Sequence, residues 1–282
     1  SYPCTFEWDP TRFPNPKLFL DQLAAKGVSA NLWLNPYVSP KSSLYPLVKN
    51  LTGSHTVWNG LVPDFTLTKT RQLYKDHFKK NHLDIGVGGY KIDEVDGYDN
   101  WVWPDVATFP SGTSAEQMRQ MYGSMVQKMT ADWYKEINKR TYGLVRASNA
   151  GGSHLPYVIY NDYYNHKDFI TALVNSSFVG VLWTPEVRAS KTAEEWIRRM
   201  QSACFSPMAM INAWADGTKP WTFPEVAEAV KDVANLRMQL LPYLYTTFAA
   251  YHREGKPPFR AMQLVDGFVS QNMQERGQFD AT

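Results

Sequence analysis

The sequence lacks several features that would assign the protein to other functional classes. Its net charge is only +2, with acidic and basic residues interspersed, which excludes the one-sided basic surface typical of nucleic-acid-binding or membrane-surface proteins. No apolar run approaches the length of a membrane span. The only two cysteines, Cys4 and Cys204, are compatible with either free thiols or a disulfide, so they do not fix the cellular compartment.

Internal repeats, low-complexity linkers and a signal peptide are also absent. The opening residues, Ser1-Tyr2-Pro3, look like an internal point of a longer protein rather than a natural start. Glycosylation sequons begin at Asn50 and Asn175, and they are used only in secreted proteins. The location is therefore left open, with a secreted or extracytoplasmic protein favoured.

Aromatic residues are abundant, with 10 Trp and 16 Tyr among 282 residues. Aromatic faces stack on the apolar faces of sugar rings, but large rings also fill cores and interfaces. The composition alone therefore leaves a sugar-binding site and simple packing as equal alternatives.

Predicted strands and helices alternate along the chain, which indicates an α/β fold with a parallel sheet. A (β/α)8 TIM-type barrel needs eight strands, and about six of the eight βα units are found here. We therefore interpret residues 1–282 as one partial barrel domain that lacks the first two strands. The six predicted strands are Val28–Leu34, Gly86–Asp93, Gly143–Ala147, Tyr157–Asn161, Phe178–Trp183 and Ser206–Ile211. The predicted helices are Pro16–Lys26, Thr68–Asn81, Ser114–Arg140, His166–Val174, one from Thr192 through Ser202, and a last one from Pro224 to Gly255.

The second predicted strand ends in a cluster of carboxylates that begins at Asp93. Barrel enzymes carry catalytic residues at such strand ends. Lys91 lies two residues earlier on the same strand face, and its ammonium is expected to keep Asp93 ionised, as a nucleophile requires. A strand-end salt bridge and a metal site are the alternatives. The oxygen ligands for a metal would be Asp93, Glu94, Asp96 and Asp99, but their spacing does not match a calcium loop, and we predict no metal.

Asp162 follows a second apolar strand, Tyr157–Tyr160, and has Tyr163 and Tyr164 beside it. Partial burial raises the pKa of a carboxyl group, as a general acid requires. The alternative is a helix cap for the segment that starts at His166. Two carboxylates delivered by two strands of one barrel are the minimum equipment for glycoside hydrolysis.

Six stretches of sequence resemble, in order, motifs of the catalytic barrel of glycoside hydrolase family 31, which comprises retaining α-glucosidases, α-xylosidases and α-galactosidases. They are Phe6 to Pro14, Val62-Pro63-Asp64-Phe65-Thr66, Tyr90-Lys91-Ile92-Asp93, the sixteen-residue spacing of Arg146 and Asp162, Leu240 to Tyr245, and Gly255 to Arg260. Together they cover nearly the whole chain.

The resemblance implies that Asp93 is the nucleophile and Asp162 the general acid/base, with Asp96 supporting the nucleophile strand. It also implies that Arg146 binds the hydroxyls of the sugar through its donor fork. Further substrate-binding candidates are Lys91, Trp33, Tyr160, Trp183, Glu186 and Asn212.

Four motifs depart from the family pattern, and all four fall around the expected sugar pocket. The chain has Asp93-Glu94-Val95-Asp96 for D-M-N-E, Ile159-Tyr160-Asn161-Asp162 for W-x-G-D, Thr184-Pro185-Glu186-Val187-Arg188 for D-I-G-G-F, and Asn212 for a histidine. This pattern predicts altered sugar specificity on a retained scaffold.

The function expected from these residues is a retaining, exo-acting hydrolase of terminal α-linked hexose. An α-galactoside or α-N-acetylgalactosaminide is considered beside an α-glucoside. The alternative is a catalytically silent sugar-binding or structural module. The partners expected are an oligosaccharide or glycoconjugate substrate and the remainder of the barrel outside this sequence, with no nucleic acid, no membrane span and no cofactor.

Overall fold

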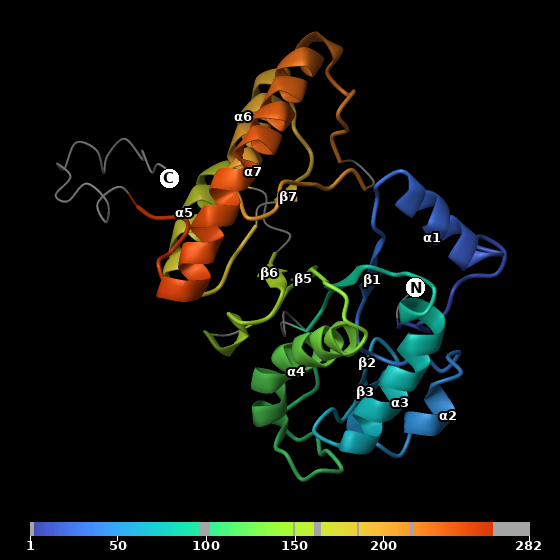
Figure 1. The fold of residues 1–282 in the computed structure, drawn as a ribbon. Coiled ribbons are helices and arrows are strands. Elements are labelled where there is room, and N and C mark those ends of the chain that lie inside the picture. The colour runs from blue at the N-terminus through green and yellow to red at the C-terminus, as the bar shows by residue number, and fades with distance from the viewer. Residues whose placement is uncertain are drawn as a thin grey trace. The chain divides into compact units, whose positions relative to one another are not determined.

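The computed structural model describes residues 3–95, 102–148, 150–160, 165–184, 186–214 and 217–261. The chain forms two compact units, residues 1–157 and 158–282, which are described separately. Figure 1 traces their elements in chain order from blue to red.

The first unit is built on parallel strands in the order β1 (Asn31–Leu34), β4 (Gly89–Ile92) and β5 (Gly143–Val145). The register pairs Leu34 with Ile92, and Ile92 with Val145. The next strand in sheet order is β6 (Tyr157–Ile159), which begins on the last residue of the unit. The predicted parallel α/β fold is therefore confirmed. Within the described residues, the strands form one four-stranded and two two-stranded sheets rather than a closed ring.

The helices of the first unit begin and end at recognisable capping residues. Helix α1 (Pro16–Ala25) starts after Asn15, and α4 (Ala115–Glu136) starts after the predicted cap Ser114; each cap side chain accepts a hydrogen bond from a backbone N–H of the first turn. At the end of α4, Asn138 adopts a left-handed backbone with φ 53°. The N–H groups of residues 138 and 139 bond back to Lys135 and Tyr134, which closes the helix as a Schellman motif.

Helix α3 (Thr68–Phe78) is shorter than predicted because a π-helical turn, Lys79–Leu83, follows it. A short helix, α2 (Tyr45–Val48), comes before the hairpin that the sequence analysis did not predict. That hairpin pairs β2 (Thr52–Val57) with β3 (Gly60–Pro63) in antiparallel fashion. Its turn places Trp58 and Asn59 at φ 53° and 62°, the positive values that both central residues of a type I′ turn require, and asparagine adopts such values more readily than most residues.

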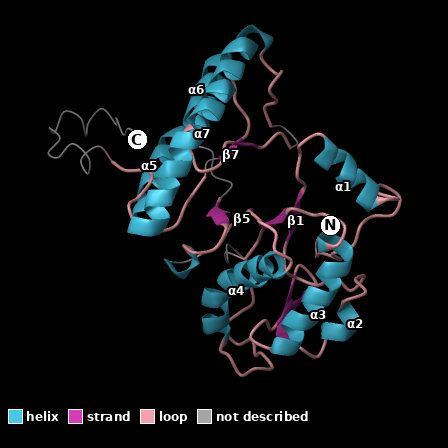
Figure 2. Cartoon of the chain, in the orientation of Figure 1, coloured by secondary structure: helices cyan, strands magenta, loops and turns pink. Residues whose placement is uncertain are grey.

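The second unit is mainly helical, as Figure 2 shows. It contains α5 (His166–Phe178), β7 (Glu186–Val187), α6 (Ala193–Cys204), β8 (Met210–Ile211), a 3₁₀ turn (Pro224–Val226) and α7 (Ala227–Glu254). Strands β7 and β8 pair in parallel. Helices α6 and α7 pack on each other around a core of Trp196, Met200, Ala203, Val187 and Val230.

The predicted strand Phe178–Trp183 is wrong. Phe178 is the last residue of α5, and Gly180, with φ 83°, ends the helix in a Schellman motif in which the N–H of Val181 bonds to Ser176. Trp183 makes only an isolated parallel bridge with Ile159. The regular strand begins at Glu186 instead. The predicted strand Ser206–Ile211 is likewise confined to its last two residues.

The predicted helix start at Thr192 is confirmed. The Thr192 side chain accepts from the N–H of Glu195, and the Glu195 carboxylate accepts from the N–H of Lys191, one residue before the cap. At the other end of the unit, α7 continues through Pro242 and stops at Gly255, which has φ 69°. This glycine in the left-handed region is the stop signal that the sequence predicted.

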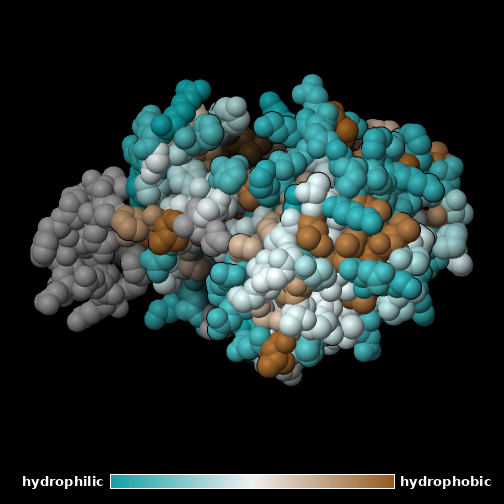
Figure 3. Space-filling view, turned by 90° about the horizontal axis from the view of Figure 1, so that it is seen from below, coloured by the Kyte–Doolittle hydropathy of each residue, from teal (hydrophilic) through white to brown (hydrophobic). Residues whose placement is uncertain are grey.

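Large apolar side chains remain exposed in both units, among them Val106, Trp214, Trp221, Tyr245 and Met238. Figure 3 shows apolar patches between hydrophilic side chains on one face of the molecule. Among the described residues, no helix is long and apolar enough to cross a membrane. Cys4 and Cys204 are both buried free thiols.

Candidate active site

Three polar residues directly follow three neighbouring parallel strands. Asn35 follows β1, Asp93 follows β4 and Arg146 follows β5. Because the carboxyl ends of parallel strands lie along one edge of a sheet, these side chains share the edge where barrel enzymes carry their catalytic groups. The backbone hydrogen bonds of the sheet extend to two of these residues, because the Asp93 N–H donates to the Leu34 carbonyl and the Arg146 N–H donates to the Ile92 carbonyl.

The Asp93 carboxylate is buried, with 8% of the residue exposed, and both of its oxygens are held. Oδ2 accepts from the Trp33 indole N–H at 2.6 Å. Oδ1 accepts from the Glu94 backbone N–H at 2.9 Å and lies 3.4 Å from the Arg146 guanidinium. These contacts fix the orientation of the Asp93 carboxylate, as catalysis by a positioned group requires.

Glu94 holds this arrangement through its backbone. Its φ of 58° lies in the left-handed region, which residues with a Cβ rarely adopt. The Tyr37 hydroxyl donates to the Glu94 carbonyl at 2.7 Å, and the Asn35 amide nitrogen lies 3.4 Å from the Glu94 carboxylate. All three of these side chains are buried. Such backbone outliers concentrate at functional sites.

Cys4 lies beneath this edge, and its sulfur accepts from the Asn35 N–H at 3.5 Å. Burial raises the pKa of the Cys4 thiol to about 11, and the negative charges of Glu94 and Asp93 also raise it. Because only the thiolate is a good nucleophile, Cys4 is a packing residue at neutral pH.

Of the residues predicted for the site, Trp33, Lys91, Asp93 and Arg146 lie together in the first unit. Lys91 pairs in register with Trp33 in the sheet. Arg146 contacts Asp93 directly, a contact that the sequence analysis did not predict for it. Asp162 and Asp96 lie outside the described residues, so their predicted roles remain predictions.

Four other predicted residues belong to the second unit. Tyr160, Trp183 and Glu186 are almost fully buried. The Trp183 indole nitrogen has no hydrogen-bond partner among the described residues, and its ring packs against Phe169. Asn212 follows β8 directly; its N–H donates to Val187 and its side chain accepts from the N–H of Trp214. These residues belong to the other unit than Asp93, and their predicted substrate contacts stay predictions.

The sequence analysis missed Asn35 and Tyr37 as site residues and considered Glu94 only as a metal ligand. The signal for Asn35 was available, because it follows a predicted strand just as Asp93 does. No group of three or more metal-ligating side chains occurs within the described ranges. Of the four carboxylates in the metal alternative, Asp96 and Asp99 fall outside those ranges.

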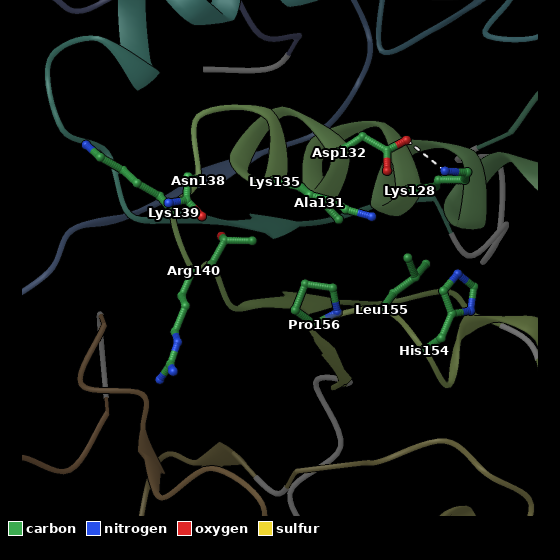
Figure 4. A pocket seen from close by; sticks show the side chains of 11 residues that line it. Lys128, Ala131, Asp132, Lys135, Asn138, Lys139, Arg140, His154, Leu155 and Pro156 are labelled. Atoms are coloured by element: carbon green, nitrogen blue, oxygen red, sulfur yellow. Dashed lines mark hydrogen bonds and ion pairs between the residues drawn. The ribbon is translucent and has the colours of Figure 1, made fainter. Parts of the chain in front are cut away.

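Two hollows occur in the first unit. One of about 300 Å³ borders Trp33 and is also lined by Phe6, Trp8, Phe13 and His82, so the indole that binds Asp93 adjoins a largely aromatic recess. The other, of about 670 Å³, lies at the end of α4 and is lined by residues that precede β5 and β6. It is therefore at the opposite ends of the strands from Asp93. Figure 4 shows its Lys135 and Lys139 side chains extending in opposite directions rather than converging.

Comparison with known proteins finds relatives that match most of the length of this chain. An α-xylosidase from Emericella nidulans is 23% identical over 92% of this chain and 36% of its own length. Neutral α-glucosidase AB from Sus scrofa is 28% identical over 91% of this chain and 31% of its own length. The chain thus spans about a third of the length of these curated relatives.

A solved structure of a family 31 α-xylosidase from a soil metagenome, complexed with xylose, superposes with a TM-score of 0.84. The match covers 99% of this chain and 48% of that one at 18% identity, which establishes the shared fold. Residues 1–247 match the profile of the glycosyl hydrolases family 31 TIM-barrel domain. The chain therefore belongs to the TIM-barrel domain family of the family 31 glycosyl hydrolases.

Proposed function

We propose that the protein is a retaining α-glycoside hydrolase and that this chain supplies its nucleophile, Asp93. The observation that carries the proposal is the Asp93 carboxylate, which is buried at the strand edge with both oxygens held by donors. Family membership supports the same assignment. The predicted general acid/base is Asp162.

The proposed reaction has two displacements. In the first, an Asp93 oxygen forms a bond to the anomeric carbon while the glycosidic C–O bond breaks. The departing oxygen takes the bonding electron pair and a proton from Asp162. In the second, water attacks the anomeric carbon, Asp162 takes a proton from that water, and Asp93 leaves as a carboxylate. The two inversions return the α configuration.

The sugar is the open part of the proposal. The two curated relatives described above are named an α-xylosidase and a neutral α-glucosidase, which favours α-glucoside or α-xyloside as the substrate. The four motif departures around the pocket support a shifted specificity, with α-galactoside and α-N-acetylgalactosaminide as the further candidates.

The test is hydrolysis of a panel of 4-nitrophenyl α-glycosides by the full-length protein. The panel holds the glucoside, xyloside, galactoside and N-acetylgalactosaminide, with the matching β-glycosides as controls. Turnover of one α-glycoside, with the α-sugar as first product by NMR, is the expected result. The β-sugar as first product would overturn retention. Sugar binding by calorimetry without turnover would support the silent sugar-binding module instead.

A further inference from the structure

Tyr37 is fully buried, and its hydroxyl reaches the edge of the site. It follows β1 by three residues, and its ring stacks on Tyr122 with centroids 6.5 Å apart. The hydroxyl donates to the Glu94 carbonyl, one peptide unit beyond the Asp93 carboxylate. This contact links the turn after β1 to the turn after β4.

The Glu94 backbone needs such a contact because its left-handed φ of 58° is unfavourable for a residue with a Cβ. This conformation accompanies the bond from the Glu94 N–H back to Asp93 Oδ1 at 2.9 Å. The φ and ψ of Glu94 set the angle between the peptide unit before it, which carries this N–H, and the peptide unit after it, which carries the carbonyl that Tyr37 binds. If Glu94 relaxed to an extended or right-handed backbone while the chain beyond it stayed in place, the peptide unit before it would have to turn and carry its N–H away from that oxygen. The carbonyl held by Tyr37 and the N–H that holds Asp93 lie on the two peptide units that meet at the Glu94 Cα, so the left-handed conformation couples the direction of one to that of the other.

We infer that Tyr37 is a positioning residue for the proposed nucleophile and acts through the backbone of Glu94. Its hydroxyl keeps Glu94 left-handed, and the Glu94 N–H then holds Asp93 Oδ1 while Trp33 holds Oδ2. The inference rests on the role proposed for Asp93. It assigns to Tyr37 an effect on the rate of glycosylation rather than on the binding of sugar.

The test compares Tyr37→Phe with Tyr122→Phe in the full-length protein. Tyr122 is a matched control, because it is equally buried in the same stack and donates to a backbone carbonyl, that of Pro63. Both variants lose one buried hydroxyl, and only Tyr37→Phe loses the bond to Glu94. On the aryl α-glycoside cleaved best in the panel, Tyr37→Phe should lower kcat by about tenfold to a hundredfold with KM changed less than about twofold. Tyr122→Phe should keep kcat within about twofold.

A second pair of variants isolates the backbone of Glu94. In the Tyr37→Phe protein, Glu94→Ala and Glu94→Gly both remove the carboxylate, but only glycine adopts a positive φ without cost. Glu94→Gly should therefore recover more kcat than Glu94→Ala. Equal kcat in these two proteins, or a Tyr37→Phe kcat equal to that of Tyr122→Phe, would overturn the inference.

A readout without turnover separates this inference from the proposed function. Amide hydrogen exchange at Glu94 should accelerate in Tyr37→Phe and not in Tyr122→Phe, because only the former frees that N–H. If the natural protein hydrolyses none of the α-glycosides, the proposed function fails and the exchange at Glu94 alone decides the inference. Unchanged exchange in Tyr37→Phe would then refute it.

Discussion

The indole N–H of Trp33 donates to Asp93 Oδ2 at 2.6 Å, although the two residues are 60 positions apart in the sequence. Trp33 lies in β1 and Asp93 follows β4, and the parallel pairing of these strands brings them together. Trp33 is predicted from the sequence to bind sugar. The structure gives its polar atom a partner in the proposed nucleophile, while 36% of the residue stays exposed.

Replacing Trp33 with Phe should therefore impair catalysis while keeping an aromatic ring at the site. The lost bond is made to a charged group, and such bonds contribute about 1.5–3 kcal/mol. We expect kcat on an activated aryl α-glycoside to fall by roughly ten- to a hundredfold. Trp221→Phe is the control, because Trp221 is 72% exposed and lies in the other unit. Equal kcat in the two variants would show that the Trp33 indole N–H does not support Asp93.

The sequence predicts the three neighbouring strands β1, β4 and β5, but not all of their bounds. The end of β1 at Leu34 is as predicted, whereas β4 ends one residue earlier than predicted, at Ile92, and β5 ends two residues earlier, at Val145. The run Phe178–Trp183 looked like a strand because it is aromatic and β-branched. Gly180 was a competing signal, because a glycine after an amphipathic helix is a typical helix stop. The structure follows the glycine.

The charged residues of the site could be predicted from the sequence, but the hydrogen bonds that hold them could not. Asp93 is predicted from a strand end and from the resemblance to a family, and Arg146 from the resemblance alone. The roles of Tyr37 and Glu94 depend on a left-handed backbone at position 94. A glutamate in the sequence does not predict this conformation, because residues with a Cβ rarely adopt it. No local pattern reveals that Tyr37 reaches Glu94 across 57 positions. Contacts of this kind are set by the tertiary packing of the two turns.

Arg146 and Asp93 form an ion pair in which only 9% and 11% of the side chains are exposed. Removing one member of a buried pair leaves the other charge uncompensated, at a cost of about 3 kcal/mol or more. Arg146→Met should therefore lower the free energy of unfolding by about that amount. In an Asp93→Asn background the same substitution should cost much less, because no charge is left unpaired.

The measurement for Arg146 is urea unfolding of the two single variants and the double variant. Lys128→Met is the control, because Lys128 and Asp132 form an exposed helical pair that is worth about 0.5 kcal/mol or less. A double variant whose loss equals the sum of the single losses would contradict a direct interaction between Arg146 and Asp93.

The buried His82 should make the free energy of unfolding depend on pH. Burial, together with the neighbouring His77, lowers the pKa of the His82 imidazole to about 3. The imidazole packs on Phe78 and contacts the Tyr90 hydroxyl. Between pH 6.5 and that lowered pKa, the unfolded chain binds a proton at His82 that the folded chain does not. The free energy of unfolding should therefore fall as the pH falls, by about 1.4 kcal/mol per pH unit from this group.

Urea unfolding between pH 7 and 5 measures this slope before most carboxylates titrate. His82→Gln should remove the contribution of this one histidine from the slope of the free energy of unfolding against pH, although it lowers stability at every pH. His55→Gln, at an exposed histidine, is the matched control for the loss of one imidazole. An unaltered slope in His82→Gln would mean that His82 is protonated in the folded protein.

The two predicted catalytic carboxylates should differ in how their loss can be bypassed. Without Asp93 no glycosyl–enzyme bond can form, so Asp93→Ala should abolish turnover of every substrate. Without Asp162, a leaving group that needs no protonation can still depart, and Asp162→Ala should retain glycosylation by activated aryl glycosides. Azide should then accelerate turnover of Asp162→Ala by attacking the glycosyl–enzyme, which needs no general base. The measurement is kcat on an activated and on a natural substrate, with and without azide. An equal loss on both substrates, with no effect of azide, would remove Asp162 from the acid/base role and leave Asp93 without its expected partner.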